Sequence, residues 1–431
     1  MTLVGLDDTD SREDGMCTTY VATRIAERLR AVGRVNRLVL VRLNPAVEYK
    51  TRGNAALAIH TTVSPDRTFE IAREEIEAGA VRTDPRTNPG LVVAGHAIGE
   101  GDDGPVDPVP QGVSDFARSA MVDLLTLEEA TSVAEAAGYR VAGWGDGRGR
   151  IGALAAVGAR DALEEWTYER ITYREPERWG TPRQVHPESV RTAADDAYPS
   201  IWDTIDREAD ELVCVPRTPG PVLFGIRGDS RSVVERVAER IDGEPVLTAA
   251  TFETNQGTDV HLQDGTLGSL RDGRAYRVDG IVDDVPETRR GGHVFVPIAD
   301  PAGGTLTPCV AFEPTKRFRD HVRALRPGDV VTVCGEVSQG TIKLEKFALR
   351  ERTTHEYVTP TCPDCGRTME SAGRDQGYRC RECSRTAPGR ERVALDRSIQ
   401  TGWYEVPPRA RRHVAKPLVR GDFDAPVHPE R

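Results

Sequence analysis

Three carboxylates near the start of the chain have the residue types and spacing of a metal and nucleotide site. Asp7, Asp8 and Asp10 follow residues 3–6, an apolar run that predicts a buried strand, and a helix is predicted from Thr18 onwards. Carboxylates at a strand end suit magnesium, which prefers oxygen ligands and nucleotide phosphates, and a helix N-terminus attracts phosphate. We therefore predict that Asp7 and Asp8 hold magnesium. The alternative is that these residues form only a turn and a helix cap.

Four cysteines make the most specific pattern in the chain. Cys362 and Cys365 form one Cys-x-x-Cys pair, and Cys380 and Cys383 form a second. Four thiolates at this spacing predict a closed tetrahedral zinc site, which has no open position for catalysis. The segment between the pairs has a single aromatic residue, Tyr378, so it needs the metal to fold. Iron–sulfur ligation is the alternative, but the ribbon-type spacing favours structural zinc.

The length and composition describe a multidomain protein without a membrane segment. The chain has 431 residues, which predicts two to four domains, and 38% of them are hydrophobic. No apolar run approaches the roughly 18 residues of a membrane span. The N-terminus enters a predicted strand directly, without the pattern of a signal peptide. We expect a cytoplasmic protein with no membrane partner.

The charge composition is unusual, because basic residues are almost all arginine. The chain has 57 Lys and Arg, of which only five are Lys, against 68 Asp and Glu, which gives a formal charge of −11. An acidic, Lys-poor surface keeps a protein soluble at high salt, so we expect a salt-loving source. The net acidity therefore does not exclude a nucleic-acid partner. Such a partner must be bound by local arginine clusters, shape and base contacts.

Two consecutive blocks of mixed strands and helices are predicted in the first 265 residues. In residues 1–142 the pattern predicts an α/β domain, with strands at 35–43 and 55–62 and helices at 66–78, 114–125 and 127–137. In residues 143–265 it predicts a ferredoxin-like α+β unit. This second unit has predicted strands at 152–157, 167–173, 212–216, 222–226 and 246–252, and a helix at 230–241.

A glycine-rich segment at residues 143–152 joins these two blocks. It contains the pattern G-x-G-x-x-G at Gly147, Gly149 and Gly152. A dinucleotide-binding interpretation is weak, because the flanking βαβ unit and the ribose-binding acid are not clear. A glycine and arginine loop whose backbone approaches a phosphate-bearing ligand fits these residues better.

The strand pattern of residues 270–352 predicts an OB-fold barrel. Strands are predicted at 276–282, 293–298, 306–312, 330–335 and 341–349, with a helix at 316–325 between the third and fourth. Such barrels bind oligonucleotides on one face, although this one could serve only to link domains. A zinc ribbon at 355–390 follows.

Residues 391–431 form a basic C-terminal segment in which aromatic and basic residues alternate. Trp403 and Tyr404 precede a run of cationic side chains that suits phosphate contact and base stacking. With Tyr378 of the predicted ribbon, we expect these side chains to contact nucleic acid: Arg409, Arg411, Arg412 and Lys416. The alternative is a solvated, disordered tail.

Nine sequence stretches, in order along almost the whole chain, carry a family resemblance. They are GLDDTDS at 5–11, GMCTTY at 15–20, RLNPAVEYKTRGN at 42–54, GRGRIGALAAVGA at 147–159, VLFGIRGDS at 222–230, TNQGTDVHL at 254–262, AFEPTKRFR at 311–319, ESAGRDQGYRCREC at 370–383 and YEVPPRARRHVAKPL at 404–418. On these stretches the chain resembles the archaeal tRNA-isoleucine 2-agmatinylcytidine synthetases (TiaS).

The resemblance implies a four-part ligase: a kinase-like ATP domain, a ferredoxin-like domain, an OB-fold and a zinc ribbon. The family attaches agmatine to C2 of the wobble cytidine of isoleucine tRNA with a CAU anticodon, which then reads AUA. It implies that ATP is cleaved to AMP and phosphate, that the C2 oxygen is phosphorylated, and that the agmatine amine displaces that phosphate. It also implies that Thr18 is autophosphorylated.

Site residues follow from the resemblance and from the chemistry of phosphate binding. We expect Asp7, Asp8, Asp10 and Thr18 to be catalytic. Expected ATP and phosphate contacts are Ser11, Gly15, Thr19, Lys50, Arg52, Gly53, Asn54 and Arg148. Agmatine needs a carboxylate for its guanidinium group and apolar walls, but the sequence does not assign that carboxylate.

Two alternatives remain open at this stage. One is a non-catalytic OB-fold and zinc-ribbon protein that binds single-stranded nucleic acid. The other is an ATP-dependent tRNA modifier that uses another amine, such as lysine.

Overall fold

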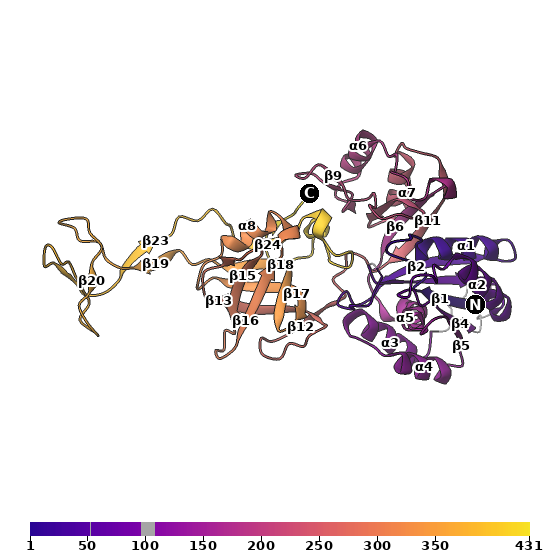
Figure 1. The fold of residues 1–431 in the computed structure, drawn as a ribbon, viewed down its shortest axis with the longest axis horizontal. Coiled ribbons are helices and arrows are strands. Elements are labelled where there is room, and N and C mark those ends of the chain that lie inside the picture. Colours follow the sequence, from indigo (N-terminus) through magenta and orange to yellow (C-terminus); the bar gives the residue numbers. More distant parts are fainter. Residues whose placement is uncertain (52, 96–107) are drawn as a thin grey trace.

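The computed structural model describes residues 1–51, 53–95 and 108–431. The molecule is elongated, with a small cysteine-rich tip on a thin stalk at one end, a barrel in the middle and the two α/β blocks at the other end (Figure 1). The predicted site residue Arg52 lies outside the described residues.

One sheet of nine strands runs through both α/β blocks, in the order β5-β4-β1-β3-β2-β11-β6-β10-β7. Its strands are β1 (Thr2–Asp7), β2 (Val35–Arg42), β3 (Ala55–Thr61), β4 (Gly90–Gly95), β5 (Arg140–Gly143), β6 (Thr167–Arg174), β7 (Ile201–Trp202), β10 (Val222–Gly228) and β11 (Val246–Thr254). Strand β1 is antiparallel to both of its neighbours, β3 and β4. The two blocks meet where β2 pairs with β11 in parallel.

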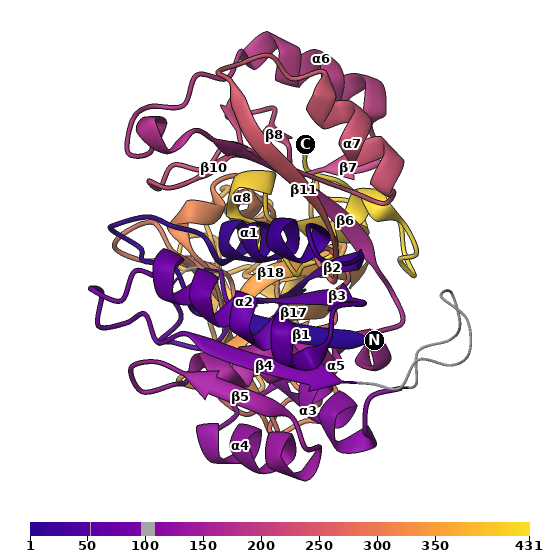
Figure 2. The ribbon, with the colours of Figure 1, turned by 90° about the vertical axis from the view of Figure 1, so that its right-hand side faces the viewer.

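Helices cover both faces of the first half of this sheet (Figure 2). One face carries α1 (Thr18–Arg30) and α2 (Pro65–Gly79), and the other carries α3 (Gln111–Val122), α4 (Leu127–Ala136) and α5 (Gly149–Ala162). Alternate residues of β1 point to opposite faces, so that Val4 and Leu6 join the core under α1 and α2, whereas Leu3 joins the core under α5. Gly5 has no side chain, which lets α5 pack directly on β1.

Two strand predictions in the second block are wrong. Residues 152–157 lie inside helix α5, which is buried along most of its length, so its residues are apolar all round. Such a short apolar run fits a buried strand and a buried helix equally well. Of residues 212–216, only Leu212 is in a strand, the two-residue β9 (Glu211–Leu212), which pairs with β8 (Ile205–Asp206).

The other predicted elements of this block are confirmed. Strands β6, β11 and β10 lie side by side, and α6 (Pro187–Ala197) and α7 (Arg231–Glu239) pack over them. Their shared core contains Val190, Phe224, Ile226, Val234 and Val237. Trp179 follows the short helix η1 (Pro176–Arg178) and packs edge-on against Tyr20 of the first block.

The predicted barrel is confirmed as a closed sheet. It comprises β13 (Ala275–Val282), β15 (Val294–Ala299), β16 (Leu306–Ala311), β17 (Val330–Ser338) and β18 (Thr341–Glu351), and α8 (Phe318–Arg323) lies between the third and fourth strands. The pairs β13–β15, β15–β16, β16–β18, β18–β17 and β17–β13 close the circle. Short elements flank it: β12 (Leu262–Asp264), β14 (Glu287–Thr288) and η2 (Glu313–Thr315).

Beyond the barrel the chain leaves along a two-stranded stalk and returns. The stalk pairs β19 (His355–Val358) with β23 (Glu391–Ala394), and the tip holds β20 (Glu370–Ser371), β21 (Tyr378–Arg379) and β22 (Thr386–Ala387). The last part of the chain then folds onto the barrel as β24 (Gly402–Glu405), η3 (Pro408–Ala410), η4 (Leu418–Arg420) and β25 (Val427–His428). The disordered-tail alternative does not hold for this segment, because β24 pairs with β18 and Trp403 is buried.

None of the helices in the described ranges combines the length and the apolar character needed to cross a membrane.

Candidate active site

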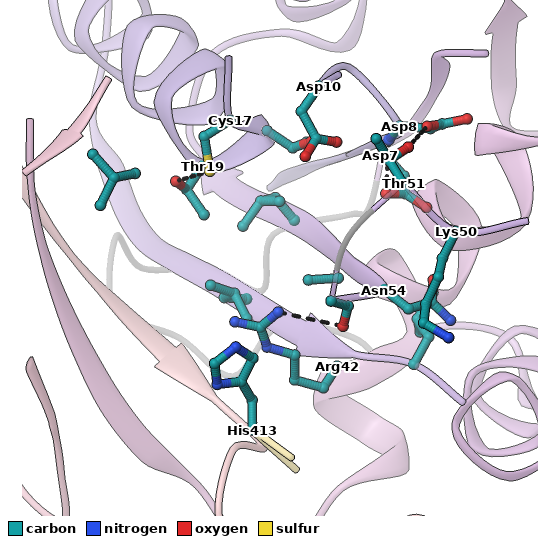
Figure 3. Close-up of a pocket in the computed structure, with 18 of the residues that line it drawn as sticks. Asp7, Asp8, Asp10, Cys17, Thr19, Arg42, Lys50, Thr51, Asn54 and His413 are labelled. Atoms are coloured by element: carbon teal, nitrogen blue, oxygen red, sulfur yellow. Dashed lines mark hydrogen bonds between the residues drawn. The ribbon is translucent and has the colours of Figure 1, made fainter. Parts of the chain in front are cut away.

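A cavity of about 440 Å³ lies where β1 ends and α1 begins (Figure 3). Its wall includes most of the site residues expected from the sequence: Asp7, Asp8, Asp10, Thr18, Thr19, Lys50, Gly53, Asn54 and Arg148. Residues far apart in the chain therefore meet at one place, and the predicted grouping is supported by geometry.

Asp7 and Asp8 form the most strongly perturbed carboxylate pair of this wall. The carboxylate of Asp7 accepts a hydrogen bond from the backbone N–H of Asp8 (2.7 Å). Burial, and then the neighbouring charge of Asp8, raise the pKa of Asp7 well above its ordinary value. Asp8 accepts hydrogen bonds from the hydroxyl of Thr51 (3.0 Å) and the backbone N–H of Asn88 (2.9 Å), yet burial still raises its pKa to about 6.

Asp10 lies on the same wall but at some distance from the other two carboxylates (Figure 3). Ligand oxygens of Asp7, Asp8 and Asp10 do not all lie within 4.8 Å of one another, so the three side chains do not form a preassembled metal cage. Magnesium commonly takes one or two protein carboxylates and completes its shell with phosphates and water. The donor set of Asp7 and Asp8 fits that pattern.

The N-terminus of α1 opens onto the cavity. Cys17 precedes the helix and offers no side-chain cap, and no acidic residue occupies the first turn. Thr18 begins the helix, and its hydroxyl accepts a hydrogen bond from the hydroxyl of Thr9 (3.1 Å). The hydroxyl of Thr19 contacts the thiol of Cys17 (3.0 Å). The N–H groups of a helix N-terminus and two hydroxyls suit a bound phosphate.

The loop before β3 supplies the expected phosphate contacts, but the described side chains are held by the loop itself. The ammonium of Lys50 donates to the carbonyls of Pro45 (2.6 Å) and Val47 (2.7 Å), and burial lowers its pKa. The amide of Asn54 donates to the carbonyl of Asn44 (2.7 Å). Gly53 packs against the Arg42 guanidinium, which leaves no room for a side chain.

Two predicted phosphate contacts, Ser11 and Gly15, lie outside the cavity wall. The hydroxyl of Ser11 donates to Asp84 (2.7 Å) and accepts from the backbone N–H groups of Glu13 and Asp14. Gly15 has a φ of 88° and touches Gly220, so it shapes the turn that leads into α1. Both residues hold the loop between β1 and α1.

The glycine-rich segment ends at the cavity, as a phosphate-contact interpretation requires. Arg148 pairs with Asp146 (3.1 Å), lies over the ring of Tyr49, and helps to hold the pKa of Asp8 down against burial. Gly149 and Gly152 lie in the first turn of α5, where Gly152 faces Asp7. The dinucleotide-binding interpretation fails, because the glycines follow the edge strand β5 and pack α5 on the sheet rather than opening a βαβ unit.

Sequence reasoning missed a part of the wall that consists of two cations, Arg42 and Arg227, and of His413. Burial, with Arg227 close by, lowers the pKa of Arg42 to about 10. Burial and these two arginines lower the pKa of His413 well below its ordinary value, so the imidazole is neutral. Glu169 lies beside them, pairing with Arg227 (3.2 Å) and accepting from Gln256 (2.5 Å). Arg42, Arg227 and His413 lie in the matching stretches RLNPAVEYKTRGN, VLFGIRGDS and YEVPPRARRHVAKPL, which is the signal in the sequence that could have identified them.

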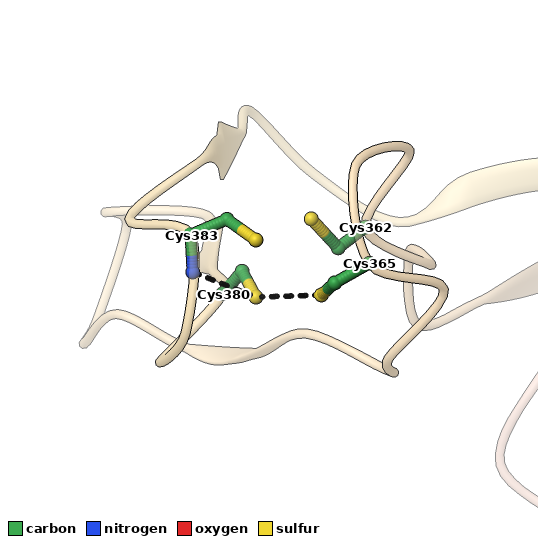
Figure 4. Close-up of side chains that lie close together, drawn as sticks. All are labelled: Cys362, Cys365, Cys380 and Cys383. Atoms are coloured by element: carbon green, nitrogen blue, oxygen red, sulfur yellow. Dashed lines mark hydrogen bonds between the residues drawn. The ribbon is translucent and has the colours of Figure 1, made fainter.

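The four predicted zinc ligands meet at the tip of the stalk (Figure 4). The sulfur atoms of Cys362, Cys365, Cys380 and Cys383 all lie within 4.8 Å of one another, and the Cys365–Cys380 pair is separated by 3.5 Å. Little else holds the tip together, since its apolar cluster contains Met369, Tyr378 and Ala387 besides two of the cysteines. Sulfur ligands at this spacing fit zinc.

The predicted tRNA contacts in the C-terminal segment divide into two groups. Arg411 does not fit the prediction: its side chain is 2% exposed and pairs with Asp203 and Glu405, which ties the segment to the second block. Arg409 and Arg412 are each 30% exposed, and Lys416 and Tyr378 are partly exposed. An arginine in a basic run can be a surface group or a buried ion-pair partner, and the sequence does not distinguish them.

Comparisons with known proteins agree with this geometry. Three family models match the chain: the TiaS TCKD domain at residues 3–146, the TiaS FLD domain at 147–261 and the TiaS C-terminal zinc ribbon domain at 359–399. A 2-agmatinylcytidine synthetase TiaS of Haloquadratum walsbyi, which acts on an isoleucine tRNA, is 51% identical over 100% of both chains. The TiaS of Methanosarcina mazei is 42% identical over 97% of both.

Solved structures match over the full length as well. A complex of TiaS with its isoleucine tRNA and ATP superposes with a TM-score of 0.87 at 40% identity, covering 100% of this chain and 99% of that one. A complex of TiaS with the same tRNA, AMPCPP and agmatine gives a TM-score of 0.85 at 38% identity, over the same shares. Fold and site together define an ATP-dependent tRNA-modifying ligase. The chain belongs to the TiaS family of isoleucine-tRNA 2-agmatinylcytidine synthetases.

Proposed function

We infer that this chain uses ATP to join agmatine to C2 of the wobble cytidine of isoleucine tRNA with a CAU anticodon. The observation that carries this conclusion is the cavity at the end of β1, where buried carboxylates face the N-terminus of α1 in a chain that matches TiaS proteins from end to end. A carbonyl oxygen is a poor leaving group, so the C2 oxygen has to be activated before an amine can displace it.

Asp7 and Asp8 are the residues that would hold magnesium. Burial raises the pKa values of both carboxyl groups, and the charge of Asp8 raises the pKa of Asp7 further, so a cation beside them is favoured. When bound, magnesium neutralises charge on the phosphoryl group that is transferred. Both backbone and side-chain donors hold Asp8 in place, through Asn88 and Thr51, so the carboxylate is positioned before the ligand arrives.

The residues around the helix N-terminus hold the phosphates of ATP in this proposal. The first N–H groups of α1 and the hydroxyls of Thr18 and Thr19 form one side of the phosphate site, and Arg148 forms the other. Lys50 and Asn54 also line the cavity. Their described contacts are with backbone carbonyls, so a direct role requires them to exchange those contacts for phosphate oxygens.

The chemistry then proceeds in two balanced steps. In the first, the C2 oxygen attacks a terminal phosphorus of ATP, so that an O–P bond forms, the P–O bond to the rest of the nucleotide breaks, and the shortened nucleotide leaves. In the second, the agmatine amine forms a bond to C2 and gives up a proton, while the C2–O bond breaks and the oxygen leaves with the phosphate. The target cytidine must leave its stack to expose C2, which is less costly in an anticodon loop than in a duplex.

RNA binding is assigned to the other parts of the chain. We place the ATP site in a kinase-like domain at 1–142, next to a ferredoxin-like domain at 143–265. The barrel at 270–352, the zinc ribbon at 355–390 and the exposed cations of 391–431 bind the tRNA. Arg409, Arg412, Lys416 and Tyr378 remain proposed contacts. Because tRNA is the substrate, we place the enzyme in the cytoplasm.

One experiment separates this function from its alternatives. The purified, zinc-loaded protein is incubated at high salt with ATP, magnesium, labelled agmatine and a CAU-anticodon isoleucine tRNA transcript, followed by nucleoside mass analysis. Elongator methionine tRNA, which also carries CAU, is the control, and lysine replaces agmatine in a parallel reaction. An agmatine adduct on the isoleucine tRNA alone is the expected result. A lysine adduct would indicate another amine, and no adduct with retained tRNA binding would indicate a non-catalytic binding protein.

A further inference from the structure

A second cavity, of about 700 Å³, adjoins the active-site cavity. Arg42, Lys50, Gly53 and His413 line both cavities, so the two share one wall. The second cavity lies between three parts of the molecule: residues 45–50 and Gly53 of the first block, the β17–β18 hairpin of the barrel, and residues 411–414 of the C-terminal segment. Of the described residues proposed to bind ATP, only Lys50 and Gly53, on the shared wall, line it.

A cluster of cations is exposed in this second cavity. Lys343 pairs with Glu336 (2.9 Å), and Arg412 pairs with the other carboxylate oxygen of Glu336. Lys50 is near enough that both of these cations help to lower its pKa. Three cations therefore share one buried carboxylate. The side chains of Lys343 and Arg412 are 32% and 30% exposed, so their remaining donors can reach a ligand.

The other charged groups on the wall do not cancel the positive charge of these cations. Arg411 is neutralised by its own buried ion pairs with Asp203 and Glu405. The carboxylate of Asp272 accepts the backbone N–H groups of Gln339 (2.8 Å) and Gly340 (2.9 Å). Glu48 also lines the cavity. The cationic groups on the wall outnumber the carboxylates.

Lysine is rare in this chain, which makes its position informative. Of the five lysines, two line this cavity, Lys50 and Lys343. An acidic chain whose basic residues are almost all arginine thus has two of its lysines beside one opening. A compact ammonium group with three donors is well suited to phosphate oxygens.

We propose that the second cavity binds the phosphodiester backbone of the RNA next to the target cytidine, with Lys343 and Arg412 contacting the phosphates. This inference rests on the proposed function, which places the cytidine in the first cavity. A nucleotide held there remains covalently joined to its neighbours, so the strand has to leave through an adjoining opening. The second cavity is such an opening, and its size is that of a site for a small ligand or a nucleotide. In this arrangement the barrel and the C-terminal segment contact the RNA strand directly beside the reaction centre.

The test uses Lys343→Gln and Arg412→Gln in the full-length, zinc-loaded protein. The affinity for isoleucine tRNA is measured over a range of salt concentrations. Each variant should bind more weakly, and the slope of log K against log salt should fall in magnitude by about 0.7 for each lost phosphate contact. Arg67→Gln and Arg73→Gln are matched controls, since both residues lie on α2 of the first block, pair with an acid (Glu70 and Glu77) and are absent from this wall. Both controls should keep the wild-type slope.

A further variant tests the same cavity without breaking an ion pair. Gln339→Glu is nearly isosteric, lies on the cavity wall and keeps the backbone N–H that bonds to Asp272. The added negative charge should weaken tRNA binding. Wild-type affinity and slope in all three variants would overturn the inference, as would a rise in the KM for ATP with unchanged tRNA binding. Because binding is measured without turnover, failure of agmatine transfer in the wild type would count against the proposed function and not against this site.

Discussion

Gly152, in the first turn of α5, lies directly against the carboxylate of Asp7. A Cβ at position 152 would overlap with Asp7 Oδ2 and would also press on Ala56 of β3. The helix that packs on the sheet thus fixes the position of Asp7, the first of the proposed catalytic carboxylates. The glycine is needed because of this close approach, since its backbone conformation is that of an ordinary helix.

Gly152→Ala should therefore displace Asp7 and lower turnover by at least about tenfold, which corresponds to about 1.4 kcal/mol in the barrier, with a raised magnesium requirement. Gly112→Ala is the matched control, because Gly112 also lies in a helix and nothing is within 4 Å of a Cβ there. A glycine-to-alanine change at a compatible helical position stabilises by about 0.4–1 kcal/mol. The measurement is kcat as a function of magnesium concentration. Equal activity of the two variants would show that Asp7 is not held by this contact.

Asp8→Asn should abolish turnover and leave tRNA binding nearly intact. The amide keeps the size of the side chain and can still accept the hydrogen bond from Thr51 or from Asn88. It removes the charge that would hold magnesium. Single-turnover assays and tRNA affinity are measured on the same preparation. Asp66→Asn, at an exposed position of α2, serves as a control for charge alone. Parallel loss of tRNA binding in Asp8→Asn would contradict the proposed metal role.

How far the sequence predicts this structure depends on whether a feature is local. The zinc site and the barrel follow from spacing and strand alternation, and both are confirmed in outline. The strand prediction at residues 152–157 is wrong because a buried helix of small apolar residues has no polar face to reveal its period. Tertiary packing, and not the local pattern, determines that these residues form a helix.

The active-site wall shows the same limit. Asp7 and Thr18 are close in sequence and are predicted together, whereas Arg42 and His413 are about 370 positions apart and meet only because β2 pairs with β11 and the C-terminal segment folds back. The backbone N–H of Gly257 donates to the carbonyl of His413 (2.9 Å), which fixes that segment. The burial of Arg411 has the same origin, since its partner Asp203 lies in another block.

Thr18 should become phosphorylated when the protein is incubated with ATP and magnesium. Its hydroxyl lies at the start of α1, where the helix N-terminus favours added negative charge and the first turn holds no acidic residue. Phosphopeptide mass analysis should locate one phosphate at Thr18, and Thr18→Ala should lose it. Thr23→Ala, further along α1 and absent from the cavity wall, is the control and should keep the label. Label on another residue in the wild type would contradict the assignment.

A buried ion-pair network between the second block and the barrel should make the stability of the folded protein depend on pH in the acidic range. His261 contacts Glu345 (3.0 Å), and Lys346 pairs with Asp259 (2.7 Å). His261, and then Lys346, hold the pKa of Glu345 at about 2 despite its burial, compared with an ordinary value of 4.5. A lowered pKa in the folded state contributes stability above the unfolded value, which is lost as pH falls towards 2.

Glu345→Gln should therefore be less stable than the wild type at neutral pH, and the difference should narrow as the pH falls from about 4.5 towards 2. Denaturant unfolding at a series of pH values measures this. Glu356→Gln, at an exposed position on the stalk, is the control and should show no such trend. A difference that stays constant through this range would mean that the charge of Glu345 does not stabilise the junction.

Cys380→Ser should remove zinc from the tip and weaken tRNA binding, while the barrel and the two α/β blocks stay folded. The four sulfur atoms lie within one coordination sphere, and the tip has almost no other core, so its folding depends on the metal. Metal analysis, tRNA affinity and thermal unfolding are measured together. Cys334→Ala is the control, because that thiol is buried in the barrel, far from the cluster in sequence, and zinc should be retained. Full zinc content in Cys380→Ser would refute the ligand assignment. Zinc loss with unchanged tRNA affinity would instead show that the ribbon does not contribute to RNA binding.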